Sequence, residues 1–248
     1  MIVKRLATML VGCLLAATTV FAAEAVDPEV EKALRAKLDN PAVGLTVASV
    51  ATSEMPGIYE VQFDNGPMVY ATGDGAYFLI GDLFAVRSDG FVNLAEQRRD
   101  AMRVEQLATV ATEDMIVFPA EGEPRTHITV FTDATCFYCQ KLHQEVPALN
   151  KRGVEVRYLA YPRAGVGSPG YRQLATAWCS DSPQDTLTAL KNREQVPDQV
   201  CPGNPISRQF DLGQVVGVRG TPAIITATGK MIPGYQSADD LMVTLGLN

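Results

Sequence analysis

The pair of cysteines Cys136 and Cys139 constrains the fold of this chain more than any other feature of its sequence. A compact apolar run, Ile128–Phe131, predicts a buried strand that leads directly into a helix beginning at Cys136. This helix is expected to continue to about Asn150, and Val154–Tyr161 predicts the next strand. A strand, a helix and a second strand in this order are typical of a layered α/β domain.

The spacing and position of these cysteines indicate thiol–disulfide chemistry. Residues three apart on a helix face the same side, so the two sulfurs lie within reach of one another. Free N–H groups and the dipole at a helix N-terminus favour an anion, and the thiolate is the attacking form of a cysteine. We therefore predict that Cys136 is the nucleophile and that Cys139, one turn further in and less exposed, is the resolving thiol. Such an exchange needs no cofactor, and none is predicted.

Two other interpretations of the pair are a structural zinc site and an inert disulfide. Zinc requires four ligands, and the nearby candidate is His143, whereas His127 begins the preceding strand. An inert bridge is a poor match because a strand-to-helix turn is the redox placement of a Cys-x-x-Cys motif. The sequence favours a redox dithiol, and no metal is predicted.

The N-terminus has the pattern of a cleavable export signal over residues 1–23. Lys4 and Arg5 precede an apolar stretch, and small residues follow at its end. A permanent membrane anchor and lipidation of Cys13 are the alternatives, but the apolar stretch is short, and apolar or small residues continue after Cys13. Removal of the signal takes Cys13 with it and leaves Cys136, Cys139, Cys179 and Cys201, an even number that favours disulfides in an oxidising compartment.

Charge argues against a nucleic-acid partner. The formal net charge is −7 and the isoelectric point is near 4.9, and nucleic-acid binding requires clustered basic residues.

The rest of the chain divides into three predicted parts. Residues 24–90 form a small α+β unit, with a helix that starts at Asp27-Pro28 and short alternating strands after it. Residues 91–112 contain a charged helix, which is either a solvated surface helix or a rigid connector between domains. Residues 113–248 form the α/β domain, in which a mostly helical insertion over residues 163–216 has loops near 165–170 and 202–205.

Several motifs make the chain similar to a known family. The run Phe131-Thr132-Asp133-Ala134-Thr135-Cys136-Phe137-Tyr138-Cys139 resembles the active site of DsbC-type periplasmic disulfide isomerases. Further segments match the family pattern in order: Glu113–Phe118, Val156–Arg163, Gly217–Ala223 and Pro233–Gln236. The resemblance implies a periplasmic homodimer with an N-terminal dimerisation domain, a linker helix and a thioredoxin-like catalytic domain. Implied partners are misoxidised or unfolded exported proteins and a membrane thiol reductase of the DsbD type.

The chain departs from the family pattern at two positions beside the dithiol. Phe137-Tyr138 stands between the cysteines where the family commonly has Gly-Tyr, and Gln140 replaces the usual histidine after the second cysteine. The larger Phe137 is expected to alter packing near the reactive sulfur, and Gln140 removes one possible charge.

The resemblance also assigns roles to residues far from the motif. In a thioredoxin-like fold the proline before the returning strand is cis and lies against the active-site cysteines, which identifies Thr221 and Pro222 as candidate substrate-binding residues. An ordinary trans loop proline is the alternative.

Cys179 and Cys201, 22 positions apart within the insertion, are predicted to form a structural disulfide, and a second redox pair is the alternative.

A Cys-x-x-Cys motif does not distinguish an isomerase from an oxidase. The additional N-terminal unit favours a disulfide isomerase or reductase, because a dimer forms a cleft for unfolded clients. Two alternatives remain: a reductase of sulfenic acids, as in the related DsbG type, and a periplasmic holdase chaperone that needs no dithiol.

Overall fold

The computed structural model describes residues 25–64 and 66–247, which form two compact units, one ending at Gly81 and one beginning at Asp82. The predicted signal peptide, with Cys13 and its alternative lipidation, lies outside the described residues. In the described part of the chain no helix combines the length and apolarity that a membrane span requires.

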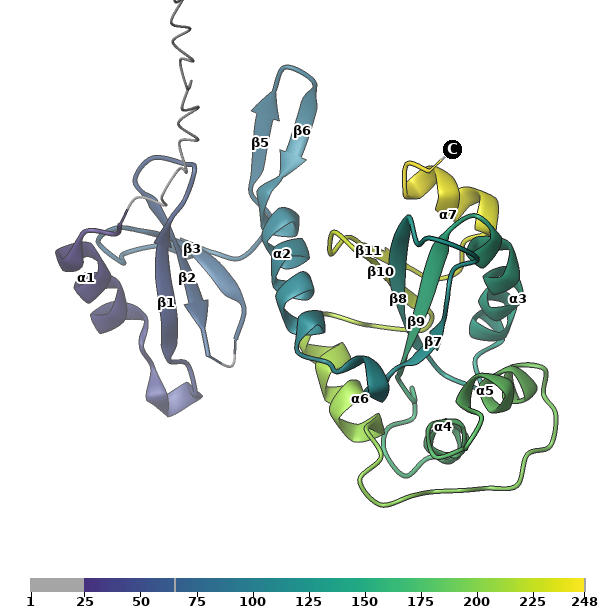
Figure 1. The fold of residues 1–248 in the computed structure, drawn as a ribbon. Coiled ribbons are helices and arrows are strands. Elements are labelled where there is room, and N and C mark those ends of the chain that lie inside the picture. The colour runs from purple at the N-terminus through teal and green to yellow at the C-terminus, as the bar shows by residue number, and fades with distance from the viewer. Residues whose placement is uncertain (1–24, 65, 248) are drawn as a thin grey trace, which may run out of the picture. The chain divides into compact units, whose positions relative to one another are not determined.

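The first unit packs one helix against an antiparallel sheet (Figure 1). Asp27 caps the helix by accepting a hydrogen bond from the Glu29 N–H at 2.8 Å, and Leu34 and Leu38 are buried against the strands. The sheet has the order β1-β2-β3-β4, so β1 and β4 are its edges. The elements are α1 (Pro28–Leu38), a 3-10 turn (Pro41–Val43), β1 (Val47–Thr52), β2 (Ile58–Phe63), β3 (Met68–Thr72) and β4 (Phe78–Leu79).

The second unit begins with a hairpin and a charged helix. Strands β5 (Phe84–Arg87) and β6 (Gly90–Asn93) pair only with each other among the described strands, and α2 (Leu94–Ala108) follows. Asn93 caps α2 by accepting from the Glu96 N–H at 2.9 Å. Arg103 is buried and fixes α2 to the rest of the unit, because its Nε donates to the Val216 carbonyl at 3.1 Å.

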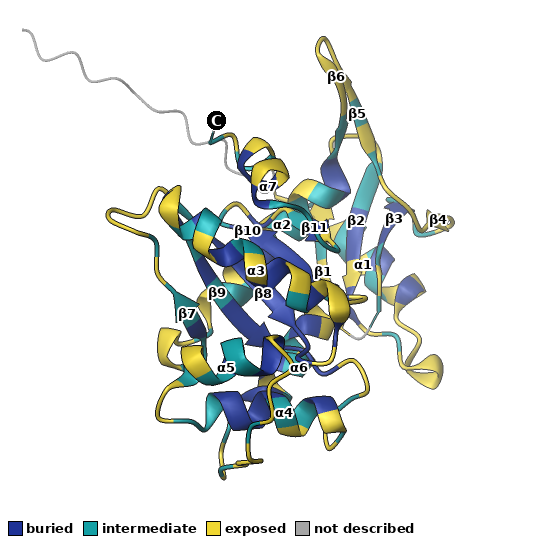
Figure 2. Cartoon of the chain, turned by 90° about the vertical axis from the view of Figure 1, so that its right-hand side faces the viewer, coloured by how far each residue is buried: buried dark blue, intermediate teal, exposed yellow. Residues whose placement is uncertain are grey.

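A five-stranded sheet in the order β11-β10-β8-β9-β7 is the centre of the second unit. Strands β8 and β9 are parallel, and the other pairs are antiparallel. Alternation along β8 places Ile128 and Val130 in one core and Phe131 in another, so both faces of the sheet are covered (Figure 2). The elements are a 3-10 turn (Thr112–Asp114), β7 (Ile116–Phe118), β8 (Thr126–Thr132), α3 (Phe137–Lys151), β9 (Val154–Ala160), β10 (Ala223–Thr226), β11 (Met231–Pro233) and α7 (Ala238–Thr244).

The insertion contains α4 (Pro169–Trp178), α5 (Pro183–Lys191) and α6 (Ile206–Val215). Residues 192–205 form a longer irregular segment than the loop predicted near 202–205. The physical reason lies at its start, where Arg193 takes a φ of 63° and ends the helical path. Pro197 and Pro202 lack an N–H and disfavour a helix interior, so no helix runs through them.

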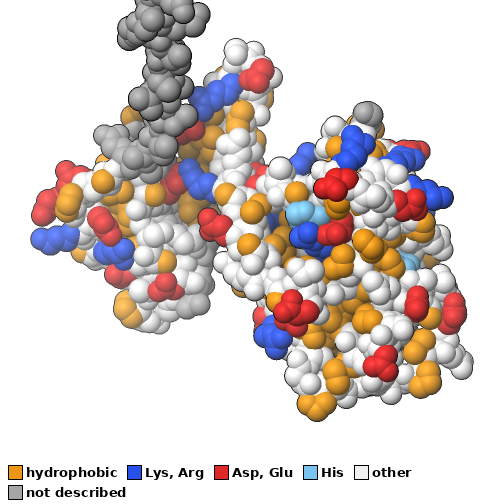
Figure 3. Space-filling view, viewed as in Figure 1, with side chains coloured by type: hydrophobic (Ala, Val, Ile, Leu, Met, Phe, Trp, Pro, Cys, Tyr) orange, Lys and Arg blue, Asp and Glu red, His pale blue; other side chains and the backbone are white. Residues whose placement is uncertain are grey.

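Acidic and basic side chains are interspersed on the face drawn in Figure 3, and no continuous basic area is seen there among the described residues.

Candidate active site

The turn between β8 and α3 is organised by the buried residue Asp133. Its carboxylate accepts hydrogen bonds from the N–H and the hydroxyl of Thr135, at 2.8 and 2.7 Å. Its carbonyl accepts from the Cys136 N–H at 3.2 Å, and Cys136 is the N-cap residue of α3. Cys136 therefore lies at the positive end of the helix dipole, where a thiolate is stabilised.

The two thiols are both free and both buried, with exposed fractions of 3% for Cys136 and 1% for Cys139. A hydrogen bond from the Cys139 thiol, aided by the Cys139 N–H and the charge of Arg163, outweighs burial and lowers the pKa of Cys136 to about 5. Burial, followed by the hydrogen bond to Cys136, raises the pKa of Cys139. The environment thus separates a strongly acidic thiol from one that keeps its proton at neutral pH.

The loop before β10 closes over the first sulfur. The Sγ atom of Cys136 lies 3.2 Å from the carbonyl oxygen of Thr221, and the Thr221–Pro222 peptide bond is cis. The Pro222 carbonyl accepts from the Gly234 N–H at 2.9 Å, which ties this loop to the end of β11. Residues that are 85 positions apart in the sequence are thereby brought into contact.

Two charged residues beside the dithiol were not identified from the sequence. The Nε atom of Arg163, just after β9, lies 3.2 Å from the Asp133 carboxylate, and the backbone N–H of Arg163 donates to the same carboxylate at 2.9 Å. Despite burial, these hydrogen bonds and those from Thr135 keep the pKa of Asp133 below its ordinary value. Lys191, the last residue of α5, is only 2% exposed. A basic residue at a helix end is typical of a solvated C-terminus, so the pattern gave no signal of its burial.

The aromatic residues between the cysteines point outward. Phe137 and Tyr138 are 59% and 56% exposed, and their rings meet edge to face with centroids 5.4 Å apart. The expected packing of Phe137 near the reactive sulfur is therefore replaced by an exposed aromatic surface next to it.

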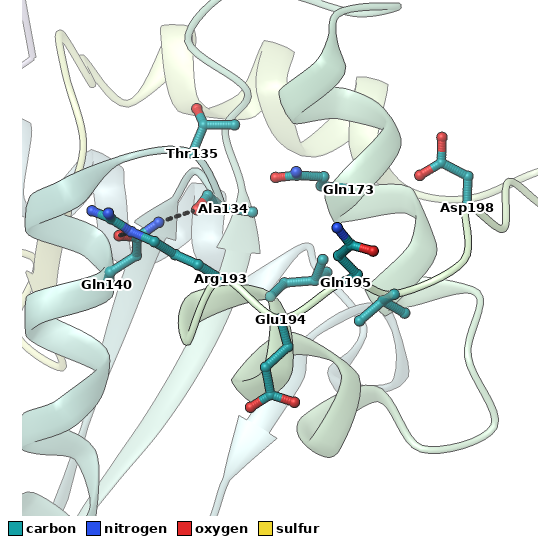
Figure 4. A pocket seen from close by; sticks show the side chains of 10 residues that line it. Ala134, Thr135, Gln140, Gln173, Arg193, Glu194, Gln195 and Asp198 are labelled. Carbon is teal, nitrogen blue, oxygen red and sulfur yellow. Dashed lines mark hydrogen bonds between the residues drawn. The ribbon is translucent and has the colours of Figure 1, made fainter.

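Gln140, in the first turn of α3, forms hydrogen bonds to the β8–α3 turn and to the segment after α5. Its Nε2 donates to the Ala134 carbonyl at 3.0 Å, and its Oε1 accepts from Arg193 Nε at 2.9 Å. Gln140 and Arg193 line a hollow of about 640 Å³ beside the β8–α3 turn (Figure 4). Polar and apolar side chains both line this hollow, and the dithiol itself is not part of its lining.

A disulfide joins Cys179, which follows α4, to Cys201 in the irregular segment, with their Cα atoms 5.7 Å apart. It connects the two ends of the part of the insertion that carries α5. In the described part of the chain, no three His, Cys, Asp or Glu side chains are grouped as metal ligands.

Two family models match the chain. A thioredoxin-like domain matches residues 111–246, and the N-terminal domain of disulfide bond isomerase proteins matches residues 21–96.

Individual relatives give the same result. The chain is 36% identical to the thiol:disulfide interchange protein DsbC of Haemophilus influenzae over 198 residues, which cover 79% of this chain and 82% of the relative. It is 36% identical to DsbC of Dickeya dadantii over 207 residues, 82% of each protein. Among solved structures, a disulfide interchange protein from Neisseria gonorrhoeae is similar, with a TM-score of 0.50 and 23% identity over 56% of this chain and 98% of that one. At this identity the structure supports the fold alone.

Proposed function

Because this chain belongs to the DsbC family of thiol:disulfide interchange proteins, we propose that it isomerises disulfides in exported proteins with Cys136 as nucleophile and Cys139 as resolving thiol. It is a thiol–disulfide oxidoreductase with a thioredoxin-like domain. One observation carries the assignment of roles. The Cys136 thiol lies at the N-terminus of α3 with its pKa lowered to about 5, beside a second thiol whose pKa is raised.

These properties give each sulfur a separate step. At neutral pH Cys136 is almost entirely thiolate and attacks one sulfur of a substrate disulfide, and the other substrate sulfur leaves as a thiolate. If a substrate thiolate then attacks the mixed disulfide, the substrate is isomerised and Cys136 is regenerated. If Cys139 attacks instead, a Cys136–Cys139 disulfide forms and the substrate is released reduced.

The Thr221–Pro222 loop is the proposed substrate edge. Thr221 lies against Cys136, and we expect its backbone groups to pair with an extended segment of a substrate chain. The exposed rings of Phe137 and Tyr138 add apolar area beside it, which suits clients whose cores are not yet closed.

We propose that residues 24–90 are the dimerisation domain and residues 91–112 the linker. The family match over residues 21–96 supports this, as do exposed apolar side chains in and beside β4 and on the β5–β6 hairpin. Edge strands of this kind favour pairing with a second chain under two-fold symmetry. The side chains are Tyr77, Phe78, Leu79, Ile80, Phe84, Val86 and Phe91.

The proposed compartment is the periplasm, reached through the signal at residues 1–23, and the proposed electron source is a membrane thiol reductase of the DsbD type. An isomerase needs Cys136 reduced, so a reductant must restore the dithiol each time Cys139 resolves the mixed disulfide and a Cys136–Cys139 disulfide forms. We propose that Cys179–Cys201 is structural, because it joins segments of the insertion and has no role in this cycle.

Trapping of mixed disulfides tests the assignment. Cys139→Ser is expected to accumulate a mixed disulfide with a scrambled substrate protein through Cys136, whereas Cys136→Ser traps none and does not refold the substrate. Equal trapping through Cys139 in Cys136→Ser would contradict the order of the two thiols.

A holdase chaperone is a second candidate, favoured by the same exposed apolar side chains. Suppression of aggregation of a cysteine-free client separates the two functions. Cys136→Ser keeps this suppression if holding is a real activity, and loses isomerase activity in either case.

A further inference from the structure

Lys191 is a buried lysine that the cycle above does not use. Its Nζ donates to the Thr132 hydroxyl at 2.6 Å and to the Asp133 carbonyl at 3.0 Å, and it lies 6.0 Å from the centre of the Tyr158 ring. Among the described residues no carboxylate lies within ion-pair distance of it. A buried ammonium without an anionic partner destabilises the folded state, and a negative charge nearby offsets this effect.

The dithiol is where that charge arises. The carbonyl oxygen of Asp133, at the end of β8, accepts from the Lys191 ammonium at 3.0 Å and from the Cys136 N–H at 3.2 Å. Burial raises the pKa of Cys139, and the charge of Lys191 opposes this. Burial lowers the pKa of Lys191, and the charges of Cys139, Asp133 and Cys136 oppose this in that order.

We propose that Lys191 is a positioning residue for the resolving step, in which its ammonium stabilises the thiolate of Cys139. The inference rests on the proposed role of Cys139 as the resolving thiol. In this step the Cys139 thiol gives its proton to solvent and its thiolate attacks Cys136 Sγ in the mixed disulfide. The Cys136–Cys139 bond forms, the bond from Cys136 to the substrate breaks, and the substrate thiolate takes up a proton. Two electrons pass from the enzyme dithiol to the substrate disulfide over the full reaction.

The other ionisable groups around Cys139 do not supply this charge. Arg163 is committed to the Asp133 carboxylate. Burial, together with the charge of Lys191, lowers the pKa of His143 to about 4, so it is neutral at pH 7. Burial raises the pKa of Tyr158, which keeps its proton. The charged and titratable groups that face the dithiol are Asp133 after β8, Cys136 and His143 at α3, Tyr158 in β9, Arg163 after β9 and Lys191 in α5.

The test follows one turnover of the reduced full-length protein with dithiobis(nitrobenzoate), which releases one coloured thiol when Cys136 attacks and a second when Cys139 resolves the mixed disulfide. Lys191→Met keeps the aliphatic stem and removes the charge. At each pH between 6 and 8, the second release in Lys191→Met is expected to be about tenfold slower than in the wild type. This is the effect of raising the Cys139 pKa by about one unit. The first release at pH 7 is expected to change little, because Cys136 remains mostly thiolate. Lys151→Met, which removes an exposed charge at the end of α3, is the matched control and leaves both rates unchanged.

Each outcome decides one question. An unchanged second release in folded Lys191→Met overturns the inference, even if its melting temperature falls. Absence of a second release in the wild type, or its persistence in Cys139→Ser, overturns the proposed function instead. If Lys191→Met does not fold, Lys191→Gln, which also removes the charge but keeps a neutral hydrogen-bond donor, takes its place. An unchanged second release in that variant refutes the inference.

Discussion

The low pKa of Cys136 predicts that the reduced protein loses stability on acidification in a way that a serine variant does not. A group whose pKa is lowered by folding stabilises the folded state above its unfolded pKa, here 9.0, and loses this contribution as the pH falls through its folded pKa of about 5. Between pH 5 and pH 7 the contribution grows by about 1.4 kcal/mol per pH unit, or at most about 2.7 kcal/mol. Cys139 contributes nothing to this difference, because its raised pKa leaves it protonated in both states throughout the range.

Urea unfolding of the reduced wild type and of Cys136→Ser, at pH 7 and at pH 4.5, measures the effect. All other titrating groups are shared, so the change in the stability gap between the two proteins isolates Cys136. The gap is expected to shrink by about 2 to 3 kcal/mol at the lower pH. Absorbance of the thiolate near 240 nm is expected to titrate with its midpoint near pH 5. A gap that does not change with pH, or a thiol that titrates near its unfolded value, would refute the electrostatic argument.

Three further predictions concern parts of the fold away from the sulfurs. Arg103→Met removes the hydrogen bond to the Val216 carbonyl and two ion pairs on α2, and is expected to lower the free energy of unfolding by about 2 kcal/mol and to raise hydrogen exchange in α2. Normal protection of α2 would show that Arg103 does not hold it. Replacing both Cys179 and Cys201 with alanine is expected to cost about 3 kcal/mol of stability, measured by urea unfolding, while the alkylation rate of Cys136 stays normal. A chain of residues 113–248 is expected to sediment as a monomer that reduces insulin and has lost most isomerase activity. Full isomerase activity in that monomer would remove the need for a dimer.

The elements that the sequence predicted well are those whose ends are marked by local chemistry. Asp27 begins a helix because its side chain accepts a hydrogen bond from an N–H group of the first turn, as the sequence pattern indicates. The β8–α3 turn was predictable for a similar reason, since an apolar run stops directly before the Cys-x-x-Cys motif.

The features of the site that the sequence does not predict depend on contacts between distant segments. Nothing local to Lys191 distinguishes a helix-end lysine in water from one buried against the end of β8. Arg163 follows β9 as an ordinary loop cation, and only the parallel pairing of β8 with β9 brings it to Asp133. The contact between Thr221 and Cys136 was expected only from the family resemblance, because no periodicity relates the two segments.

Gln140, which replaces the histidine usual in the family, changes how the site responds to pH. A histidine here would gain charge within the range where the enzyme works, since imidazole titrates near pH 6.5. The Gln140 amide instead forms a neutral bridge between the Ala134 carbonyl and Arg193.

Burial lowers the pKa of both histidines that the chain does have. Burial lowers the pKa of His143 to about 4, and burial, followed by the charge of Arg157, lowers the pKa of His127. No imidazole therefore gains charge beside the sulfurs as the pH falls from about 8 to about 6. The pH dependence of the exchange reaction in that range follows from the thiols, chiefly from the deprotonation of Cys139, because Cys136 is already a thiolate. The resolving rate should accordingly rise about tenfold per pH unit up to neutral pH, while the rate of the first attack stays flat.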